Sequence, residues 1–305
     1  MRFLFVGLGS IGQRHLKNLG AELTERNISF DVDALRSIGS PLGQDIEALI
    51  SRVYSDSEEL SGIYDSVFIT NPTYLHYETL KTVAPFAKAV FIEKPVFIDP
   101  NEHLDTLALN DDIVCYVACP LRRSPVIQRI KEILKDTKMF SAHTVCSSYL
   151  PDWRKDNYRK GYGAKKKMGG GVRLDLIHEP DYIFDLFGLP EKVMSLSTKV
   201  SNLDIDSDDY ASFILDYKDK VITLSLDYFG RAPIRKMTIL TEDDTIVADI
   251  LSNTLCYLKS GLVESFDPID IHREEMRYFL NLLEKKEENI NNLERAITTL
   301  RYALM

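Results

Sequence analysis

A glycine-rich turn near the start of the chain constrains its fold more than any other feature. The motif Gly7-x-Gly9-x-x-Gly12 follows a short apolar run and precedes a helical pattern over 11–19. The first glycine permits the tight turn, the second allows a pyrophosphate to approach the backbone, and the third permits close helix–strand packing. Free N–H groups at the helix N-terminus, around Ser10 and Ile11, favour the same anion. The turn predicts a dinucleotide site; the alternative is an ordinary strand-to-helix connection.

The pattern of apolar residues predicts two domains. Strand-like and helical patterns alternate in the first third, with helices expected over 45–53 and 102–109 among others, and this alternation is typical of a parallel sheet. Strand-like runs with short connections dominate 192–259. Short connections suit hairpins and therefore antiparallel pairing. We predict a mixed α/β chain: a Rossmann dinucleotide-binding domain at 1–118, and at 119–305 an α+β domain with a mostly antiparallel open sheet, serving substrate binding and oligomerisation.

Composition and charge narrow the functional classes. Hydrophobic residues make up 45% and charged residues 27%, the balance of a globular protein. No apolar run approaches the roughly 20 residues of a membrane span, and the opening run lacks the features of a signal peptide, so we expect a cytoplasmic protein. A net charge of -9 argues against nucleic acid as a partner. The four cysteines lack a matching set of zinc ligands, so we expect buried reduced thiols and no metal.

The end of the second predicted strand bears on the choice of dinucleotide. NAD sites place an Asp or Glu there, which binds the ribose 2′-hydroxyl. This chain instead has Arg36 and Ser37, which suit a 2′-phosphate. The sequence favours NADP; NAD remains the alternative if Arg36 is solvated and Asp31 or Asp33 binds the ribose.

Three further motifs follow the glycine-rich turn in a fixed order. They are Thr70-Asn71-Pro72 with His76, then Glu93-Lys94-Pro95, then a glycine-led helical stretch at 169–181. Over nearly the whole chain, this series resembles the Gfo/Idh/MocA family of sugar and cyclitol dehydrogenases. The resemblance implies that Thr70, Asn71, Pro72, His76 and Glu93 belong to the cofactor site. It also implies a homodimer or homotetramer formed through the open sheet of the C-terminal domain.

The resemblance implies hydride transfer between NADP(H) or NAD(H) and a hydroxyl or keto carbon of a sugar, sugar acid or nucleotide sugar. Lys94 is then the catalytic lysine at the end of a parallel strand. A lysine acts as a base only if its pKa falls from about 10.4 toward 7, and burial and the charge of an oxidised nicotinamide favour that change. The alternative is a surface lysine at a strand end.

The second catalytic element implied by the resemblance is a helix carrying Asp175 and His178. On a helix these residues, three apart, share a face, with His178 as proton relay and Asp175 as its orienting partner. The family commonly spaces the pair by four, so the equivalence of Asp175 stays open, and Asp181 is a second candidate. Pro180 predicts a kink or a late helix start. The alternatives are a helix-capping aspartate and a core histidine.

The shorter spacing resembles a branch of the family associated with nonulosonic (sialic-like) sugar pathways. Aromatic and basic residues before Gly169 suit a sugar, because aromatic rings stack on pyranose C–H faces and arginines bind carboxylates or phosphates. The candidate substrate-binding residues are Arg122, Trp153, Arg154, Tyr158 and Tyr162. The alternative is a solvated basic loop.

Two other functions stay open from the sequence. Some relatives in the family are glycoside hydrolases that use bound NAD for a transient oxidation. A dinucleotide-binding protein without catalytic activity is the other alternative, although Lys94 and His178 argue against it.

Overall fold

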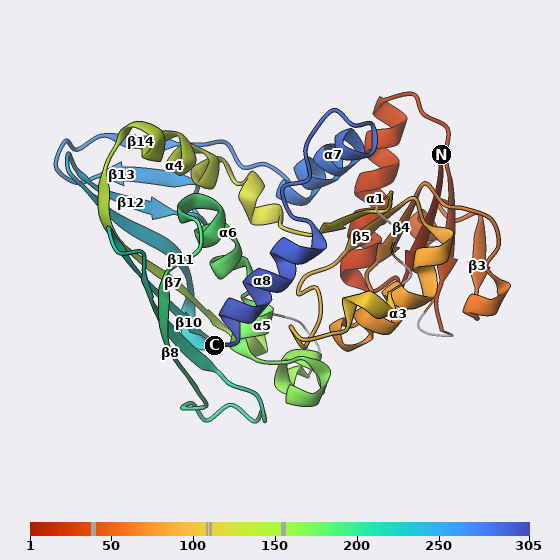
Figure 1. Ribbon diagram of the computed structural model, residues 1–305, viewed down its shortest axis with the longest axis horizontal. Coiled ribbons are helices and arrows are strands. Elements are labelled where there is room, and N and C mark those ends of the chain that lie inside the picture. The colour runs from red at the N-terminus through yellow and green to blue at the C-terminus, as the bar shows by residue number, and fades with distance from the viewer. Residues whose placement is uncertain (38–40, 108, 110–111, 154–156) are drawn as a thin grey trace. The chain divides into compact units, whose positions relative to one another are not determined.

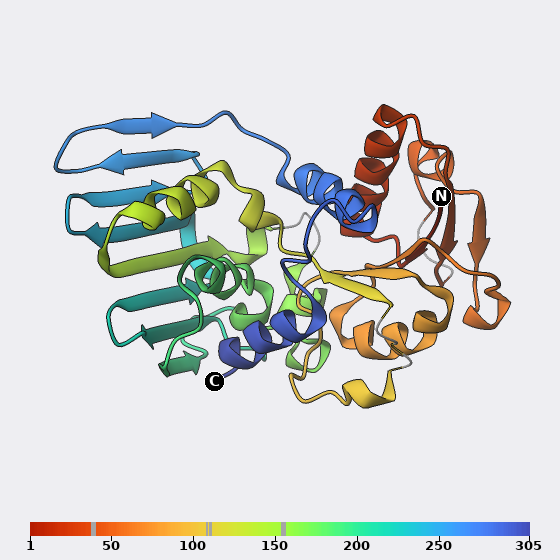
Figure 2. The ribbon, with the colours of Figure 1, turned by 45° about the horizontal axis from the view of Figure 1, so that its top comes forward.

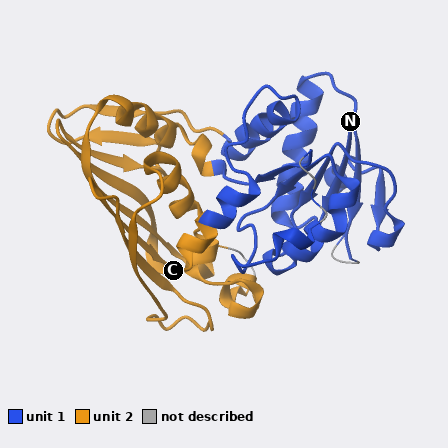
Figure 3. Cartoon of the chain, in the orientation of Figure 1, with its two compact units in different colours: residues 1–120, 270–298 blue, residues 121–269, 299–305 orange. Residues whose placement is uncertain are grey.

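The computed structural model describes residues 1–37, 41–107, 109, 112–153 and 157–305. These residues divide into two compact units (Figure 3). Unit 1 comprises Met1–Pro120 and Asp270–Thr298; unit 2 comprises Leu121–Ile269 and Thr299–Met305. The first division lies close to the expected boundary after residue 118. Residues 270–298 differ from the expectation, because they group with the nucleotide-binding unit.

The sheet of unit 1 has the strand order of a Rossmann fold. Its strands are β1 (Arg2–Val6), β2 (Asp31–Leu35), β3 (Arg52–Tyr54), β4 (Ser66–Ile69), β5 (Ala89–Ile92) and β6 (Val114–Val117). All pair in parallel in the order β3-β2-β1-β4-β5-β6. The order reverses between β1 and β4, and ligands of such sheets bind at the carboxyl ends of the strands at this point. The predicted fold of this unit is confirmed.

The helices assigned to unit 1 are α1 (Ser10–Glu25), α2 (Gln44–Glu47), α3 (His76–Val83) and α7 (Ile271–Leu283); α8 (Leu293–Ala303) begins in this unit and ends in the other. A helix predicted over 45–53 is mostly wrong. The helix ends at Glu47, and the last residues of the predicted range belong to β3, where Arg52 and Val53 pair with β2. A helix predicted over 102–109 is also wrong: among its described residues the structure has a single 3-10 turn, Leu104–Thr106.

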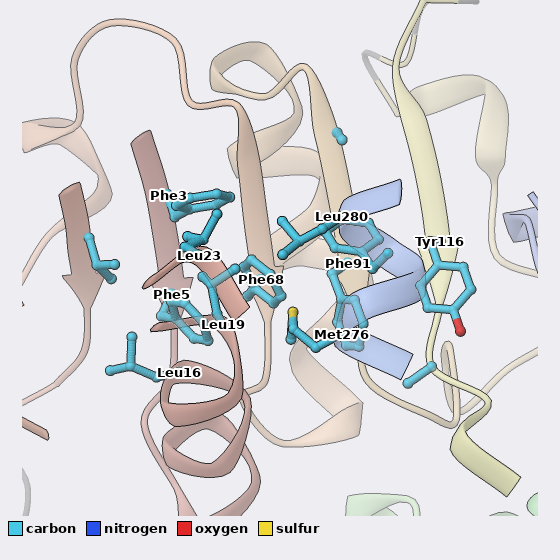
Figure 4. Close-up of a cluster of buried hydrophobic side chains, with 14 of the residues drawn as sticks. Phe3, Phe5, Leu16, Leu19, Leu23, Phe68, Phe91, Tyr116, Met276 and Leu280 are labelled. Carbon is cyan, nitrogen blue, oxygen red and sulfur yellow. The ribbon is translucent and has the colours of Figure 1, made fainter. Parts of the chain in front are cut away.

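The core of unit 1 explains why residues 270–298 belong to it. Phe68 of β4 and Phe91 of β5 both pack edge-on against Phe279 of α7, with ring centroids 5.6 and 5.2 Å apart. Met276 and Leu280 of α7 join this cluster beside α1 (Figure 4). Full burial of each such side chain stabilises by about 1.5–3 kcal/mol. Helix α7 is therefore an integral part of the nucleotide-binding unit.

Unit 2 is built on an eight-stranded sheet. Its strands are β7 (Met139–Tyr149), β8 (Lys192–Thr198), β9 (Tyr210–Asp216), β10 (Val221–Asp227), β11 (Phe229–Thr241), β12 (Thr245–Asp249), β13 (Thr254–Tyr257) and β14 (Val263–Ser265). The order is β14-β13-β12-β11-β7-β10-β9-β8, and all described pairs are antiparallel except β7 with β10. The prediction of a mostly antiparallel sheet is confirmed.

One face of this sheet is covered and the other is open. Helices α4 (Pro125–Asp136), α5 (Val172–Asp175) and α6 (His178–Phe187) lie on one side (Figures 1 and 2). Phe213 and Leu215 of β9 are buried, whereas Ile214 between them points to the opposite face and is 40% exposed. On the same open face, Met194 pairs in register with Ile214 and is 58% exposed. The side chains that alternate with the buried ones therefore form an exposed apolar surface on the open face of the sheet.

The cysteines agree with the expectation in all but one respect. All four are thiols outside any disulfide; Cys115, Cys119 and Cys146 are buried, but Cys256 is half-buried. In the part of the chain that the structure describes, no helix combines the length and apolar character that a membrane span requires.

Candidate functional site

The glycine-rich turn leads from β1 into α1. Gly7 has a φ of +86°, and a Cβ atom there would lie 2.8 Å from the Asn71 Cα. A Cβ atom on Gly12 would lie 2.6 Å from the Gly7 carbonyl oxygen. A Cβ atom on Gly9, in contrast, would meet no described atom within 4 Å. The first and third glycines are thus required by the fold, whereas the second leaves space for a ligand.

A cavity of about 640 Å³ lies beside this turn in unit 1. Six of the predicted cofactor residues line it: Gly7, Gly9, Arg36, Ser37, Asn71 and Pro72. It is also lined by residues that the motifs did not indicate: Val6, Leu8, Leu35, Ser55, Asp56, Ser57, Leu75, Glu78, Thr79, Thr82 and Val83. The residues at 55–57 were missed because β3 fell within a predicted helix. Ser10, Ile11 and Gly12 form the start of α1. The cavity and the glycine cradle fit a dinucleotide.

The end of the cavity near β2 offers hydroxyls and a guanidinium. Arg36 and Ser37 follow β2, and Ser55 and Ser57 lie in the loop after β3. Asp56 also lines the cavity, and its carboxylate accepts the Glu58 N–H at 3.0 Å. The guanidinium and the hydroxyl groups, but not the Asp56 carboxylate, suit the three acceptor oxygens of a phosphate.

Asp33, the alternative ribose ligand, has other partners. Its Oδ2 accepts hydrogen bonds from the Arg2 guanidinium at 2.8 Å and from the Tyr64 hydroxyl at 2.9 Å. Asp33 is buried, whereas Asp31 is exposed at the start of β2, away from the carboxyl end of the strand. The structure therefore gives no support to either aspartate as the ribose ligand.

Thr70 and His76 hold the loops of the site together without lining the cavity. Thr70 Oγ1 donates to the Gly7 carbonyl at 2.6 Å. The buried His76 ring lies with Nε2 2.9 Å from the Asn71 carbonyl oxygen and Nδ1 3.1 Å from those of Pro95 and Val96. Burial lowers the pKa of His76, against the opposing effect of these carbonyls. His76 thus joins the loop after β4 to the loop after β5.

The Glu93-Lys94-Pro95 motif follows β5, and the Lys94–Pro95 peptide bond is cis. Glu93 is buried, with Oε1 2.5 Å from His15 Nε2 and Oε2 accepting the Lys94 N–H at 3.1 Å. Burial alone would raise the pKa of Glu93, but the hydrogen bond and charge of His15 lower it to about 2. Glu93 is therefore an ionised residue that binds protein atoms, while the half-buried Lys94 lies at the strand end as predicted.

Unit 2 has a cavity of its own, of about 470 Å³. Three predicted substrate residues line it, Trp153, Tyr158 and Tyr162, together with the predicted catalytic Asp175. The remaining lining residues are Leu150, Asn157, Lys160, Gly161, Gly163 and Ala164. Aromatic side chains with one carboxylate and one ammonium group suit a polar ring such as a sugar.

Asp175 and His178 do not share one helix. Helix α5 ends at Asp175 and α6 begins at His178, with Leu176 in a non-helical conformation between them. The late helix start that Pro180 predicted is confirmed, and the shared helical face is wrong. Asp175 Oδ2 accepts the Tyr228 hydroxyl at 2.5 Å, a contact from β10–β11 that sequence motifs did not indicate. Burial and the neighbouring Asp175 raise the pKa of Tyr228 well above its ordinary value, so Tyr228 donates.

Arg122 and Asp181, both candidates from sequence, form a buried ion pair. Arg122 is 1% exposed, and its Nη2 and Nε lie 2.6 and 2.9 Å from the two Asp181 carboxylate oxygens. Arg122 Nη1 also donates to Asp185 at 3.3 Å. The structure does not support the prediction that Arg122 binds substrate, because the charge of a guanidinium in this setting is already matched within the fold. Arg154 lies outside the described residues.

Two family models match the chain, and their descriptions agree with the fold. An oxidoreductase family with an NAD-binding Rossmann fold matches residues 1–117, and a Gfo/Idh/MocA C-terminal domain matches residues 127–247. The chain belongs to the Gfo/Idh/MocA family. The resemblance found in its motifs is thereby confirmed.

Relatives of known sequence include sugar-acting enzymes. An uncharacterized oxidoreductase of Streptococcus pneumoniae is 25% identical over 66% of this chain, which spans about half (54%) of that protein. A D-xylose 1-dehydrogenase (NADP(+)) of Haloferax volcanii is 23% identical over 78% of this chain and 75% of its own length. A 2,7-anhydro-N-acetylneuraminate hydratase of Escherichia coli is 26% identical over 47% of this chain and 39% of its own.

Solved structures share the whole fold. A UDP-N-acetylglucosamine 3-dehydrogenase from Acidithiobacillus ferrooxidans superposes with a TM-score of 0.79 at 20% identity, over 100% of this chain and 95% of its own. At this identity the likeness shows the fold alone.

Proposed function

We propose that this protein is an NADP(H)-dependent oxidoreductase that interconverts a hydroxyl and a keto group on a sugar, sugar acid or nucleotide sugar. The observation that carries the proposal is the cavity at the carboxyl ends of β1–β4, with the open space at Gly9 and with Lys94 at the end of the adjacent strand β5. Strand ends of a parallel sheet form one edge, where bound ligand and reacting groups meet.

The proposed chemistry assigns one step to the cofactor and the others to the chain. A bound oxidised dinucleotide, held by the glycine-rich turn and Arg36, would supply the acceptor for the hydride on the hydroxyl-bearing carbon of the substrate. Lys94, as the free amine, takes the proton of that hydroxyl group, so that the C–H and O–H bonds break as the C=O bond forms. His178 is proposed to relay the proton, and Asp175 is proposed as its orienting partner, as the family resemblance implies. Reduction of the keto group is the reverse of these steps.

The preference for NADP rests on the groups at the β2 end of the cavity. Arg36 carries a positive charge there, and Ser37, Ser55 and Ser57 carry hydroxyl groups. Asp33, the alternative ligand of the ribose, is instead hydrogen-bonded to Arg2 and Tyr64. The Haloferax relative is named as an NADP(+) enzyme, which supports the same choice. Arg36→Asp is expected to weaken NADPH binding at least tenfold and to favour NADH, as measured by fluorescence titration. An unchanged ratio of the two affinities would overturn the NADP preference.

The substrate class rests on the cavity of unit 2. Trp153, Tyr158 and Tyr162 offer aromatic surface, and Asp175 and Lys160 offer one group of each charge. A sugar presents apolar C–H faces and hydroxyl groups to such a pocket. The names of the Haloferax, Escherichia and Acidithiobacillus proteins point to sugars or sugar derivatives as well.

The proposal is tested by screening sugars, sugar acids and nucleotide sugars with both cofactors and following the absorbance of the reduced nicotinamide. With an active substrate, Lys94→Ala is expected to lower kcat by about 10²–10⁴-fold and leave the NADPH Kd within threefold. Lys135→Ala, an exposed lysine on α4, is the matched control. Lost NADPH binding in Lys94→Ala would show a structural lysine and refute its role as the base.

Two other outcomes of the screen would support the alternatives. Cleavage of a glycoside without net change in absorbance, by a protein that retains NAD through purification, would indicate the transient-oxidation hydrolase. Cofactor binding without turnover of any compound, together with an unchanged cellular phenotype of Lys94→Ala, would indicate a non-catalytic dinucleotide-binding protein.

The open face of the unit 2 sheet is proposed as the surface that forms a homodimer or homotetramer. Met194 and Leu196 are each 58% exposed on β8, and Ile214 lies beside Met194 on β9. Contiguous exposed apolar surface on a sheet is typical of an interface. Met194→Asp with Leu196→Asp is expected to reduce the mass measured by light scattering to that of a monomer. Ile63→Asp, at a 53% exposed position in unit 1, is the control.

A further inference from the structure

Two residues 78 positions apart in the sequence form a buried pair next to Lys94. His15 lies on α1, one turn beyond Gly12, and has no exposed surface. Its Nε2 atom lies 2.5 Å from Oε1 of Glu93, whose side chain is 11% exposed. The second turn of the helix that begins at the cofactor cradle is thereby linked to the first residue of the Glu-Lys-Pro motif.

The second oxygen of Glu93 extends this link to Lys94. Oε2 accepts the Lys94 backbone N–H at 3.1 Å, while the Glu93 backbone N–H donates to the Ile69 carbonyl of β4 at 2.9 Å. The carboxylate thus bridges α1 and the backbone of Lys94. Since Glu93 follows the last residue of β5, this bridge fixes the direction in which the chain leaves the sheet.

The surroundings of the His15 ring restrict its orientation. The ring packs edge-on against Phe91, with centroids 4.9 Å apart, and against His272 of α7, with centroids 5.8 Å apart. Burial, Arg14 and His15 lower the pKa of His272 to about 4, so His272 is uncharged at neutral pH. Three elements, α1, β5 and α7, therefore fix the donor atom that meets Glu93.

A structural role alone does not account for this pair. Among the other buried positions of α1, Leu16, Leu19 and Leu23 are apolar and fill the core of unit 1. The buried Glu22 pairs with partly exposed arginines of α7, Arg273 and Arg277, and among the described residues it makes no contact with the Glu-Lys-Pro motif. Buried polar and ionic pairs are often replaced by apolar residues at little or no cost to stability, because the cost of desolvating them offsets their attraction. A buried polar pair placed directly against the Lys94 backbone therefore indicates a requirement for position.

We infer that His15 is a positioning residue: acting through the Glu93 carboxylate, it holds the backbone of Lys94 at the end of β5. The inference rests on the proposed function for its catalytic meaning, since Lys94 is the proposed base. The contacts from His15 through Glu93 to the Lys94 N–H, which we call the clamp, involve only residues of this chain. The effect of the clamp on the Lys94 backbone can therefore be measured without a substrate.

Hydrogen–deuterium exchange at the Lys94 amide tests the clamp directly, in peptides that span residues 92–96 of the full chain. His15→Phe keeps an aromatic ring between Phe91 and His272 but removes the donor, and is expected to raise the exchange rate of Lys94 at least tenfold. His15→Gln, which retains an N–H donor, is expected to restore the wild-type rate within threefold. Amides of β1 serve as an internal reference, and His103→Gln, at an exposed position, is the control variant.

Glu93→Ala is the second variant, because it removes the acceptor itself and is expected to raise Lys94 exchange as much as His15→Phe. A rise in Glu93→Ala without a rise in His15→Phe would overturn the role of His15. Equal rates in His15→Phe and wild type, with β1 protected in both, would also overturn it.

The failure of this inference can be told from the failure of the proposed function. Exchange at Lys94 does not depend on turnover, so a Lys94→Ala variant with full activity would refute the base and leave the clamp result standing. With an active substrate, His15→Phe is expected to lower kcat about tenfold with KM within threefold, and His15→Gln to recover it. If His15→Phe raised the exchange rate of Lys94 but left kcat unchanged, His15 would have a structural role only.

Discussion

The two cavities of this protein are built in different ways. The cavity of unit 1 lies where parallel strands end, and each of its loops begins at a position that the sheet fixes. The cavity of unit 2 is lined by 3-10 turns between Leu150 and Ala164 and by the end of a four-residue helix. Parallel strands bring distant motifs to one edge, so a short motif identifies a site. No such rule places the residues of irregular turns, and the partners of their side chains can be identified only in the folded structure.

The largest effect we predict concerns a residue that the sequence assigned to the ligand and the structure assigns to the fold. Arg122→Met leaves Asp181 and Asp185 buried with fewer partners, which is expected to lower the free energy of unfolding by about 3–5 kcal/mol. Arg129→Met removes a pair with Glu264 that is partly exposed and is expected to cost less than about 1 kcal/mol. Urea unfolding measures both changes. A stable Arg122→Met protein with weaker substrate binding would reverse this assignment.

Two glycine substitutions distinguish a glycine that leaves room for a ligand from a glycine that the backbone conformation requires. Gly9→Ala places a methyl group in open space at a φ of -68°, so stability is expected to change by less than about 1 kcal/mol. The NADPH Kd is nevertheless expected to rise about 10–100-fold, because the methyl group occupies the ligand's space.

Gly188→Ala in unit 2 is expected to behave in the opposite way. Gly188 follows α6 with a φ of +78° and a ψ of -169°, a conformation essentially restricted to glycine in which a side chain costs about 1–3 kcal/mol, but it lines neither of the two cavities. Thermal unfolding and fluorescence titration measure both variants. Equal NADPH affinities in the two proteins would remove the support that Gly9 gives to the cofactor site.

The third prediction tests whether the cavity of unit 2 takes part in turnover. Tyr228→Phe removes the hydroxyl that donates to Asp175 and is expected to lower kcat/KM about tenfold, with the NADPH Kd unchanged. Tyr217→Phe also removes a buried donor, to the Gly188 carbonyl at 3.0 Å, and should leave turnover within twofold. Equal losses in both variants would indicate a general effect on stability and no special role for Asp175.

The two units also differ in what could be predicted from sequence. Gly7, Gly9, Arg36, Asn71 and Pro72, which the sequence assigns to a cofactor site, all line one cavity, because each lies in a strand-end loop of a parallel sheet. The roles of the buried residues were not predictable. Nothing in the local sequence indicates that His15 meets Glu93, since the contact depends on how α1 packs on β5.

Unit 2 shows the same limit more strongly. The sheet and its open face follow from alternating apolar residues and short connections, and both were predicted. The break between Asp175 and His178 was only hinted at by Pro180, and the Tyr228 hydroxyl reaches Asp175 from 53 residues away. Long-range polar contacts set the environment of a site, and the periodicity of a sequence carries no information about them.

The smallest effect we predict is a loss of folding stability at acid pH that arises from His272 in unit 1. Burial, with Arg14 and His15, lowers the pKa of His272 to about 4, while Glu93 and Asp270 act in the opposite direction. An unfolded histidine has a pKa of about 6.5, so the unfolded chain binds the proton first as the pH falls. The contribution of His272 to stability is therefore full above pH 6.5 and is lost as the pH falls toward 4.

Between pH 7.5 and pH 5 this contribution amounts to about 1–2 kcal/mol of unfolding free energy. His272→Phe keeps a ring beside His15 but cannot be protonated, so its loss of stability over this range should be smaller than that of wild type by that amount. Glu93, with a pKa of about 2, stays ionised throughout the range and does not contribute to the difference. Urea unfolding at the two pH values measures the effect. Equal losses of unfolding free energy in the variant and in wild type would place the acid-sensitive group elsewhere. His143→Phe, at an exposed position in unit 2, provides the comparison between the two units.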